Sequence, residues 1–252
     1  MNLGLEGRVA AVTGGSHGLG YAIAANLLEE GCRVAICARD ARRLNDAAVA
    51  LDAGVFAQAA DVAKPGQAED FIEAAANHFG SLDILVHNAG GGGGAGLEAP
   101  DAEYSLSLEV NVLAGLRVAR AAVPFMRRQR RGRIIFIASV YGRESGGRAG
   151  YNMAKAAEIS LAKGLSRELA QDNILVNSVA PGSLMFPGST WERRQQADPE
   201  GIAAFTRSDL PLGRFGKPGE VAAAVAFLAS DRASLVTGAC WTVDGGQSRS
   251  NI

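Results

Sequence analysis

Short apolar runs alternate with longer Ala-rich stretches along almost the whole chain, and this alternation strongly constrains the fold. The runs carry few polar residues, which is typical of strands that are buried on both faces. They predict seven strands, at Arg8–Thr13, Arg33–Ala38, Val55–Ala59, Leu82–His87, Arg133–Ala138, Ile174–Val179 and Ala239–Val243. Strands of this kind, separated by helices, form a parallel sheet that helices cover on both sides.

Helices are predicted between the strands, at Leu19–Glu30, Ala41–Asp52, Gly66–Phe79, Asp101–Arg128, Tyr151–Ala170 and Pro218–Ala229. Because crossovers between parallel strands are right-handed, we expect an α/β protein with a doubly wound, seven-stranded parallel sheet, which is a Rossmann fold. The long fourth helix contains Pro124, which we expect to kink or shorten its last turns. Its Ala119, Ala121 and Ala122 are expected to form a small-residue face that permits close packing on another helix.

No linker divides the chain, so residues 1–252 are predicted to form a single domain. Gly90–Gly96 is expected to be an irregular loop, and residues 183–211 are predicted to form a lid over the substrate site. Aromatic side chains of the lid could close over an apolar substrate, while Arg193 or Arg194 could pair with a carboxylate or phosphate. A solvated amphipathic helix is the alternative interpretation of this segment.

Composition excludes several classes of protein. The 25 basic residues are balanced by 26 acidic ones, so the net charge of −1 argues against binding nucleic acid or an anionic membrane. Cys32, Cys37 and Cys240 lack paired spacing, so we expect three small buried groups and predict neither disulfides nor a metal site. The chain begins without an apolar signal core, and no run reaches transmembrane length. We therefore expect a cytoplasmic protein.

A Gly-rich turn follows the first predicted strand, and a helix follows the turn. Such a turn lets the backbone approach a pyrophosphate, while free amides and the helix dipole face the anion. The spacing is G-x-x-x-G-x-G and not G-x-G-x-x-G, so an ordinary tight turn is the alternative. Cofactor contacts are predicted from Gly14, Ser16, His17, Gly18, Leu19 and Gly20.

The end of the second predicted strand bears on the choice of cofactor. An acidic residue there would bind the ribose of NAD, whereas an Arg can accept the 2′-phosphate of NADP. Ala38 holds that position and Arg39 follows it, which favours NADP(H), while the adjacent Asp40 keeps NAD(H) open. Further cofactor contacts are expected after the third and fourth strands, from Asp61, Val62, Asn88, Ala89 and Gly90. His87 is interpreted as a structural histidine.

Three polar residues near the fifth strand suggest acid–base chemistry. Ser139 follows the strand, and Tyr151 and Lys155 open the next helix four residues apart, so they share one face of it. A phenol with a reference pKa of about 10 is a weak catalyst at neutral pH, but a neighbouring ammonium stabilises the phenolate. Ser139 could then hydrogen-bond a substrate oxygen while Tyr151 exchanges its proton. A Tyr-x-x-x-Lys pair on an ordinary surface helix is the alternative.

Because it carries these motifs in this order, the chain resembles the short-chain dehydrogenase/reductase family over nearly its whole length. The matching pieces also include Asn111, Pro181-Gly182 and the tail Val236-Thr237-Gly238…Val243-Asp244-Gly245-Gly246. The resemblance implies that Tyr151 is the general acid–base, that Lys155 holds the nicotinamide ribose, and that Ser139 orients the substrate carbonyl or hydroxyl. It also implies that Asn111 binds a water molecule in a proton relay, and that Pro181 and Gly182 contact the cofactor.

The chain departs from the family pattern at several positions. Ser139 and Tyr151 are 12 residues apart, one fewer than is commonest, so the connecting loop differs. Ser183 and its neighbours stand where a Thr often binds the carboxamide, and His17 stands where NADP-dependent members often have Arg. Family tetramers pair the helices predicted here at Asp101–Arg128 and Tyr151–Ala170, so we expect a homotetramer.

The leading hypothesis is an oxidoreductase that transfers a hydride between NADP(H) and a carbonyl or secondary alcohol. Its substrate would be a 3-oxoacyl thioester, because the chain most resembles the 3-oxoacyl-(acyl-carrier-protein) reductases. The second hypothesis is an NAD-dependent dehydrogenase of a secondary alcohol, sugar or diol. A third, from another class, is a cofactor-binding regulatory protein without turnover. The complete set of Asn111, Ser139, Tyr151 and Lys155 argues against the third.

Overall fold

Seven parallel strands form one sheet in the computed structural model, which describes residues 2–51, 54–91 and 96–251. The strands are β1 Val9–Thr13, β2 Arg33–Ala38, β3 Phe56–Ala59, β4 Ile84–His87, β5 Gly132–Ile137, β6 Ile174–Pro181 and β7 Cys240–Val243. Their order across the sheet is β3-β2-β1-β4-β5-β6-β7, which confirms the predicted doubly wound sheet. Asp52 and most of the predicted Gly90–Gly96 loop lie outside the described residues.

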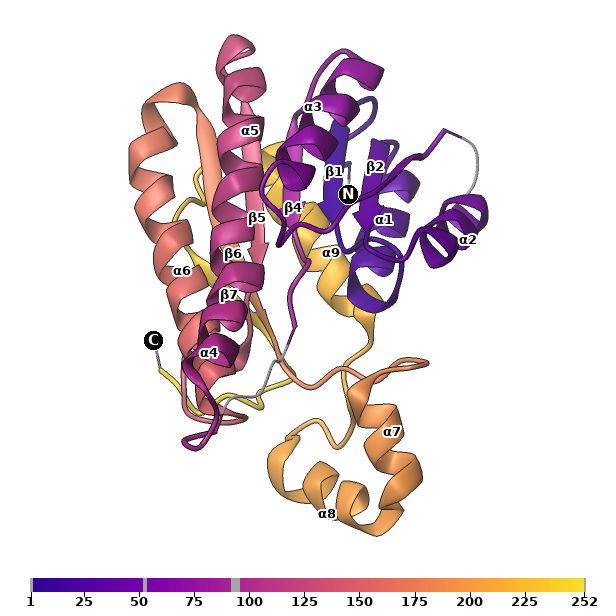
Figure 1. Ribbon diagram of the computed structural model, residues 1–252, viewed down its shortest axis with the longest axis vertical. Helices are drawn as coiled ribbons and strands as arrows, with labels where there is room; N and C mark the ends of the chain where they lie inside the picture. Colours follow the sequence, from indigo (N-terminus) through magenta and orange to yellow (C-terminus); the bar gives the residue numbers. More distant parts are fainter. Residues whose placement is uncertain (1, 52–53, 92–95, 252) are drawn as a thin grey trace.

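The strands are buried on both faces because their side chains alternate between two cores. Val9 and Ala11 of β1 join one apolar cluster, whereas Ala10 and Val12 join the other. The first cluster lies under α3 Gln67–Phe79, α5 Ala114–Arg128 and α6 Ala149–Leu169. The second lies under α1 Gly18–Glu29, α2 Ala41–Leu51 and α9 Pro218–Ala229, so helices cover both faces of the sheet (Figure 1).

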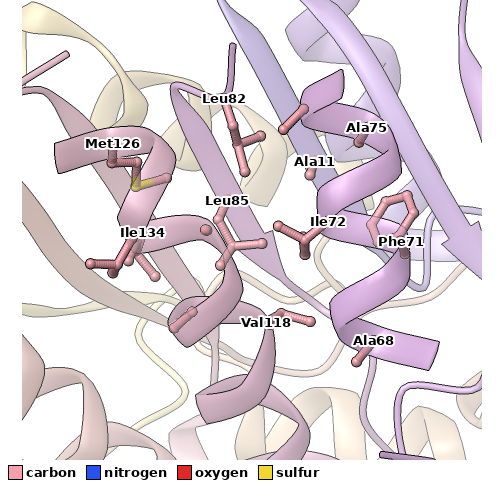
Figure 2. Packing of buried hydrophobic residues seen from close by; sticks show 14 of the residues in the cluster. Ala11, Ala68, Phe71, Ile72, Ala75, Leu82, Leu85, Val118, Met126 and Ile134 are labelled. Carbon is pink, nitrogen blue, oxygen red and sulfur yellow. The ribbon is translucent and has the colours of Figure 1, made fainter. Parts of the chain in front are cut away.

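The first cluster is filled by a few large side chains among many alanines. Ile72 of α3 points towards Leu85 of β4 in the space between the helices and the sheet, and Phe71 and Val118 belong to the same cluster (Figure 2). Ala119 and Ala122 belong to this same cluster and are almost completely buried. These two alanines therefore let α5 pack closely inside this chain, on the side of the sheet that α3 also covers, whereas Ala121 of the same predicted face is only partly buried.

The predicted helix Asp101–Arg128 is divided. The structure has α4 at Asp101–Leu108, a π-helical turn at Glu109–Leu113, and then α5. α5 runs through Pro124 and ends at Arg128, so the proline does not shorten it. The interruption occurs instead at the π turn, which has no proline or glycine to announce it. Single π turns within helices are frequent at functional sites, and this one contains Asn111.

Residues 183–211, which are called the lid after their predicted role, contain two capped helices, α7 Thr190–Ala197 and α8 Pro199–Asp209, so the segment is helical as the alternative interpretation expected. The Ser189 hydroxyl accepts a hydrogen bond from the Glu192 amide, and an Asp198 carboxylate oxygen accepts one from the Gly201 amide. Both side chains satisfy amides that a helix start leaves unpaired. Figure 1 shows that α7 and α8 project from the main body at the end where the strands terminate.

The cysteines behave mostly as predicted. Cys32 and Cys37 are buried, and burial raises the pKa of each thiol to about 12. Cys240 is only partly buried, because it begins β7 at the edge of the sheet. Among the described residues, no helix is both long enough and apolar enough to cross a membrane.

Candidate active site

A network of hydrogen bonds joins the ends of β1 and β4, where the strand order reverses. The Thr13 hydroxyl lies 3.1 Å from His87 Nδ1 and accepts hydrogen bonds from the amides of Asn88 and Ala89, at 3.1 and 2.9 Å. The Asn88 side-chain amide donates to the carbonyls of Thr13 and Gly14, at 3.1 and 3.2 Å. In open α/β sheets, ligands bind at this reversal point. Asn88 thus holds the start of the Gly-rich turn in place.

His87 is completely buried beneath this hydrogen-bond network. Burial, aided by the charge of Lys155, lowers the pKa of its imidazole to about 3. The ring is therefore neutral at physiological pH, and it packs edge-on against Phe136 with ring centroids 6.0 Å apart. These contacts agree with the structural role predicted for His87.

The Gly-rich turn has the features of an anion cradle. α1 starts after His17, whose side chain does not cap the helix, so the first-turn amides have no side-chain partner there. Gly20 packs so closely on the turn that a Cβ atom at that position would lie 2.2 Å from the Gly14 carbonyl oxygen. Any side chain at Gly20 would push the helix N-terminus away from the turn. The turn therefore fits a pyrophosphate held by backbone amides.

A cavity of about 210 Å³ lies beyond the ends of β1, β2 and β3. Seven of the predicted cofactor contacts line it: Gly14, Ser16, Arg39, Asp61, Val62, Ala89 and Gly90. Arg43 of α2 also lines it, and sequence reasoning missed this residue. The Asp40 carboxylate accepts a hydrogen bond from the Arg43 amide at 3.0 Å, so it serves as a cap beside two guanidinium groups. Arg39 and Arg43 give this cavity the charge that a phosphate needs.

Not all the predicted cofactor contacts line this cavity. His17 lies against the lid, with its ring 5.5 Å from that of Phe186. Phe186 also covers Gly18, where a Cβ atom would lie 2.5 Å from the phenylalanine ring. Leu19 packs against the second apolar cluster. The first residues of the lid therefore cross the Gly-rich turn.

A second cavity, of about 940 Å³, brings Ser139 and Tyr151 together beneath the lid. Ser139 follows β5 and starts the 3₁₀ turn Val140–Gly142, where its hydroxyl accepts a hydrogen bond from the Tyr141 amide at 3.2 Å. That hydroxyl keeps its own proton for a substrate oxygen. Trp191, Arg194 and Phe205 of α7 and α8 form the opposite wall.

Lys155 lies behind Tyr151, with its Nζ atom 5.9 Å from the centre of the tyrosine ring. The ammonium is buried, and it donates hydrogen bonds to the Ile137 carbonyl at 2.8 Å and to Glu158 Oε2 at 2.7 Å. Burial opposes its charge, but the interactions with Glu158 and Tyr151 outweigh burial and raise the pKa of the Lys155 ammonium. Lys155 therefore places a lasting positive charge beside the phenol. Sequence reasoning missed Glu158.

Asn111 occupies the π turn and is completely buried. Its side-chain amide donates to the Ser107 carbonyl at 2.8 Å and to the Gly91 carbonyl at 3.3 Å. The side chain thus ties the π turn to the loop after β4. A Cβ atom at Gly90 would lie 2.6 Å from Asn111 Oδ1 and 3.3 Å from Lys155 Nζ, so only glycine lets the loop pass so close.

Pro181 ends β6, and Gly182 lines the cavity that holds Ser139 and Tyr151. The Ser183 hydroxyl accepts a hydrogen bond from the Gln247 side chain at 3.0 Å, and the Ser183 amide donates to the same side chain at 2.7 Å. Gln247 follows the motif Asp244-Gly245-Gly246, so the C-terminal tail supports the segment that leads into the lid.

Comparisons with known proteins identify the family of this chain. The family model described as enoyl-(acyl carrier protein) reductase matches residues 14–248. The chain is 39% identical over 251 residues to the rhamnolipids biosynthesis 3-oxoacyl-(acyl-carrier-protein) reductase of Pseudomonas aeruginosa, covering 96% of both chains. It is 38% identical over 249 residues to the 3-oxoacyl-(acyl-carrier-protein) reductase FabG of Escherichia coli, covering 97% of this chain and 98% of FabG.

A solved structure is also similar. The L-sorbose reductase of Gluconobacter frateurii, complexed with NADPH and L-sorbose, superposes with a TM-score of 0.92 at 34% identity, covering 99% of this chain and 100% of the reductase. The chain belongs to the short-chain dehydrogenase/reductase family. It is an oxidoreductase that transfers a hydride between a nicotinamide cofactor and a carbonyl or secondary alcohol.

The buried neutral histidine predicts a specific pH dependence of stability. The pKa of His87 is about 3 when folded and about 6.5 when unfolded, so its neutral form stabilises the fold fully above pH 6.5. That contribution is lost as the pH falls from about 6.5 towards 3. We expect His87→Gln to be less stable than the parent at about pH 8, and the gap to narrow by about 1.4 kcal/mol per pH unit below 6.5.

Urea unfolding of both proteins across this pH range measures the gap in the free energy of unfolding. His78→Gln is the matched control, because His78 lies exposed on α3. A gap between parent and His87→Gln that stays constant from about pH 8 to about 5 would contradict the prediction.

Proposed function

We propose that this chain uses NADPH to reduce the 3-oxo group of an acyl thioester. The observation that carries the proposal is the large cavity in which Ser139 and Tyr151 face an aromatic lid. Two related proteins with this reaction in their names, from Pseudomonas aeruginosa and Escherichia coli, match nearly the whole chain. The paired guanidinium groups of Arg39 and Arg43 support NADPH over NADH.

The residues at the ends of the strands would hold the cofactor. The Gly-rich turn and the first turn of α1 would bind the pyrophosphate, and Arg39 with Arg43 would bind the 2′-phosphate. Asp61 and Val62 would lie beside the adenine, with Ala89 and Gly90 against the rest of the nucleotide. When bound, NADPH supplies the hydride.

The polar residues between the two cavities would handle the proton. Ser139 would donate a hydrogen bond to the carbonyl oxygen, and Tyr151 would give that oxygen its proton as it becomes a hydroxyl. The Lys155 ammonium stabilises the phenolate that remains, because opposite charges attract strongly where water is excluded. Asn111 would place a water molecule that returns a proton towards Lys155.

The lid would select the body of the substrate. Trp191 and Phe205 stack with ring centroids 4.6 Å apart, and Phe215 joins them at 5.1 Å from Trp191. The Arg194 guanidinium lies 4.9 Å from the centre of the Trp191 ring. This wall suits an acyl chain that ends near an anionic carrier group. The similarity to an L-sorbose reductase favours one second candidate, the reduction of a ketose.

Removal of Arg39 tests the choice of cofactor. We expect Arg39→Ser to weaken NADPH binding by roughly 10- to 100-fold, because a charge-assisted hydrogen bond to phosphate contributes about 1.5–3 kcal/mol. NADH binding should stay unchanged, since NADH lacks the phosphate. Fluorescence titration with each nucleotide measures both affinities. Arg42→Ser is the matched control, because Arg42 lies between Arg39 and Arg43 but does not line the cavity. Equal losses for both nucleotides would contradict the assignment.

A substrate panel tests the reaction. Parent protein with NADPH is assayed against a 3-oxoacyl thioester, the matching free 3-oxo acid and a ketose, and the thioester is expected to give the highest kcat/KM. Tyr151→Phe should lose at least about 100-fold in kcat, because the proton donor is absent, while NADPH affinity is retained. Tyr104→Phe is the control, since the Tyr104 hydroxyl bonds to the Gly96 carbonyl outside both cavities. A Tyr151→Phe enzyme as active as the parent would reject the proposed role.

We also propose a homotetramer that pairs α4, α5 and α6 between subunits. Leu106, Leu113 and Met153 support it, because these large apolar side chains of α4, the π turn and α6 are 57%, 43% and 39% exposed. Light scattering should give the mass of four chains, and Leu113→Glu should lower it. Val49→Glu, on the exposed face of α2, should not. A parent protein that is monomeric at micromolar concentration would rule out the tetramer.

A further inference from the structure

Glu158 is an acidic residue on the buried face of α6. Its neighbours along that face are Ala154 and Ala162, four residues to either side, and both are buried. Glu158 itself is only 1% exposed. Carboxylates are almost never fully buried unless they are paired, because leaving water is costly for a charge. The residue at this position therefore requires an explanation that packing alone does not provide.

The contacts of Glu158 lead directly to the site. Its Oε2 atom accepts a hydrogen bond from Lys155 Nζ at 2.7 Å, and both side chains are buried. The same ammonium donates to the Ile137 carbonyl at the end of β5. Among the described residues, Glu158 Oε1 has no hydrogen-bond partner. One oxygen thus holds the ammonium, while the other stays free to carry a proton.

The charge of the Glu158 carboxyl changes with pH near neutrality. Burial raises the pKa of Glu158 to about 7, although Lys155 pulls it in the other direction. Below pH 7 the carboxyl is neutral and the Lys155 charge acts alone on Tyr151. Above pH 7 the carboxylate offsets that charge, so the phenolate of Tyr151 is stabilised less.

We propose that Glu158 is a positioning residue that holds the Lys155 ammonium and sets how strongly its charge acts on Tyr151, and so sets the pH at which Tyr151 exchanges its proton. This inference rests on the roles proposed above for Tyr151 and Lys155. Glu158 touches neither cavity, so it acts only through Lys155.

The other charged groups around this pair are exposed, paired or neutral. Arg148, Arg194 and Asp198 line the same cavity as Tyr151, but all three are exposed, so solvent screens their charges. His87 on β4 faces Lys155, but it is neutral at working pH. Tyr141 on the 3₁₀ turn lies near Tyr151, and burial raises the pKa of its phenol, so it stays uncharged. Glu109 on the π turn is paired with Arg117. Asp101 and Glu103 of α4 are exposed at the first turn of that helix, where solvent screens them.

Glu158→Gln tests the inference, because glutamine keeps the shape and an acceptor oxygen but never carries the charge. With the carboxylate gone, Lys155 acts unopposed, and the phenolate forms more readily. Alcohol oxidation requires the phenolate, so its rate rises with pH, whereas ketone reduction requires the phenol and falls with pH. We expect the midpoints of both profiles to shift down by about one pH unit. One unit below the parent midpoint, oxidation should be about fivefold faster than in the parent.

Two measurements separate this role from a structural one. The pH profiles of kcat/KM in both directions give the midpoints, and ultraviolet titration of the phenolate gives a midpoint without any cofactor or turnover. In the titration, the difference from Tyr151→Phe isolates the signal of Tyr151. Glu168→Gln is the matched control, because it removes the same charge from the exposed side of α6 about 15 Å further along, and its midpoints should equal those of the parent.

Midpoints in Glu158→Gln that are unchanged or raised overturn the inference, even if the rates fall. If the variant does not fold, the parent decides: its phenolate titration should spread over a wider range than a single proton gives, because Glu158 titrates in the same range. A simple one-proton curve in the parent overturns the inference. Failure of the proposed function would give a different result, because Tyr151→Phe would then retain activity, independently of the midpoints measured for Glu158→Gln.

Discussion

The parallel pairing of β1 with β4 is the constraint on which the rest of the site depends. The two strands meet in register, with Thr13 opposite His87, and the chain order reverses between them. Helices leave the two halves of the sheet on opposite faces at this point, so a crevice opens beyond the strand ends. The Thr13 hydroxyl and the Asn88 amide use nearly all their hydrogen-bonding capacity to fix the crevice. Both cavities lie along this edge of the sheet.

The polar groups buried beneath that edge of the sheet lower the stability of the folded chain. His87 must stay neutral, Lys155 must stay charged, and Glu158 changes charge near neutrality. An all-apolar core at these positions would avoid the cost of desolvating charges. The buried charges of Lys155 and Glu158 lie beside Tyr151, where little water screens them, so they act on the phenol more strongly than charges at the surface would. The two apolar clusters, which are rich in fully buried aliphatic side chains, supply the compensating stability.

The pattern of the sequence predicted the sheet well because strands that are buried on both faces must be apolar throughout. All seven strands were predicted within two residues at each end, since a polar residue, glycine or proline lies within two residues of both ends of every run. The π turn at Glu109–Leu113 was missed because it depends on how α4 and the turn itself pack on α6, and no local residue signals it. The two lid helices were foreseen only as one helical alternative without bounds, because short polar helices lack a periodic apolar face, although Ser189 and Asp198 are typical caps.

The site residues that could be predicted are those that have a pattern in the sequence. Ser139, Tyr151 and Lys155 carry a pattern in the sequence because two of them share a helix face and the third ends a strand. Arg43 carries no such pattern, since only the folded chain brings it to the cavity beside Arg39. Glu158 carries none either, since it contacts Lys155 and lines neither cavity. Glu158 was nevertheless visible as an anomaly, because an acidic residue three positions after Lys155 interrupts the apolar face of α6. A charge in a predicted core face, one turn from a catalytic group, is therefore a signal of electrostatic tuning that sequence analysis can seek directly.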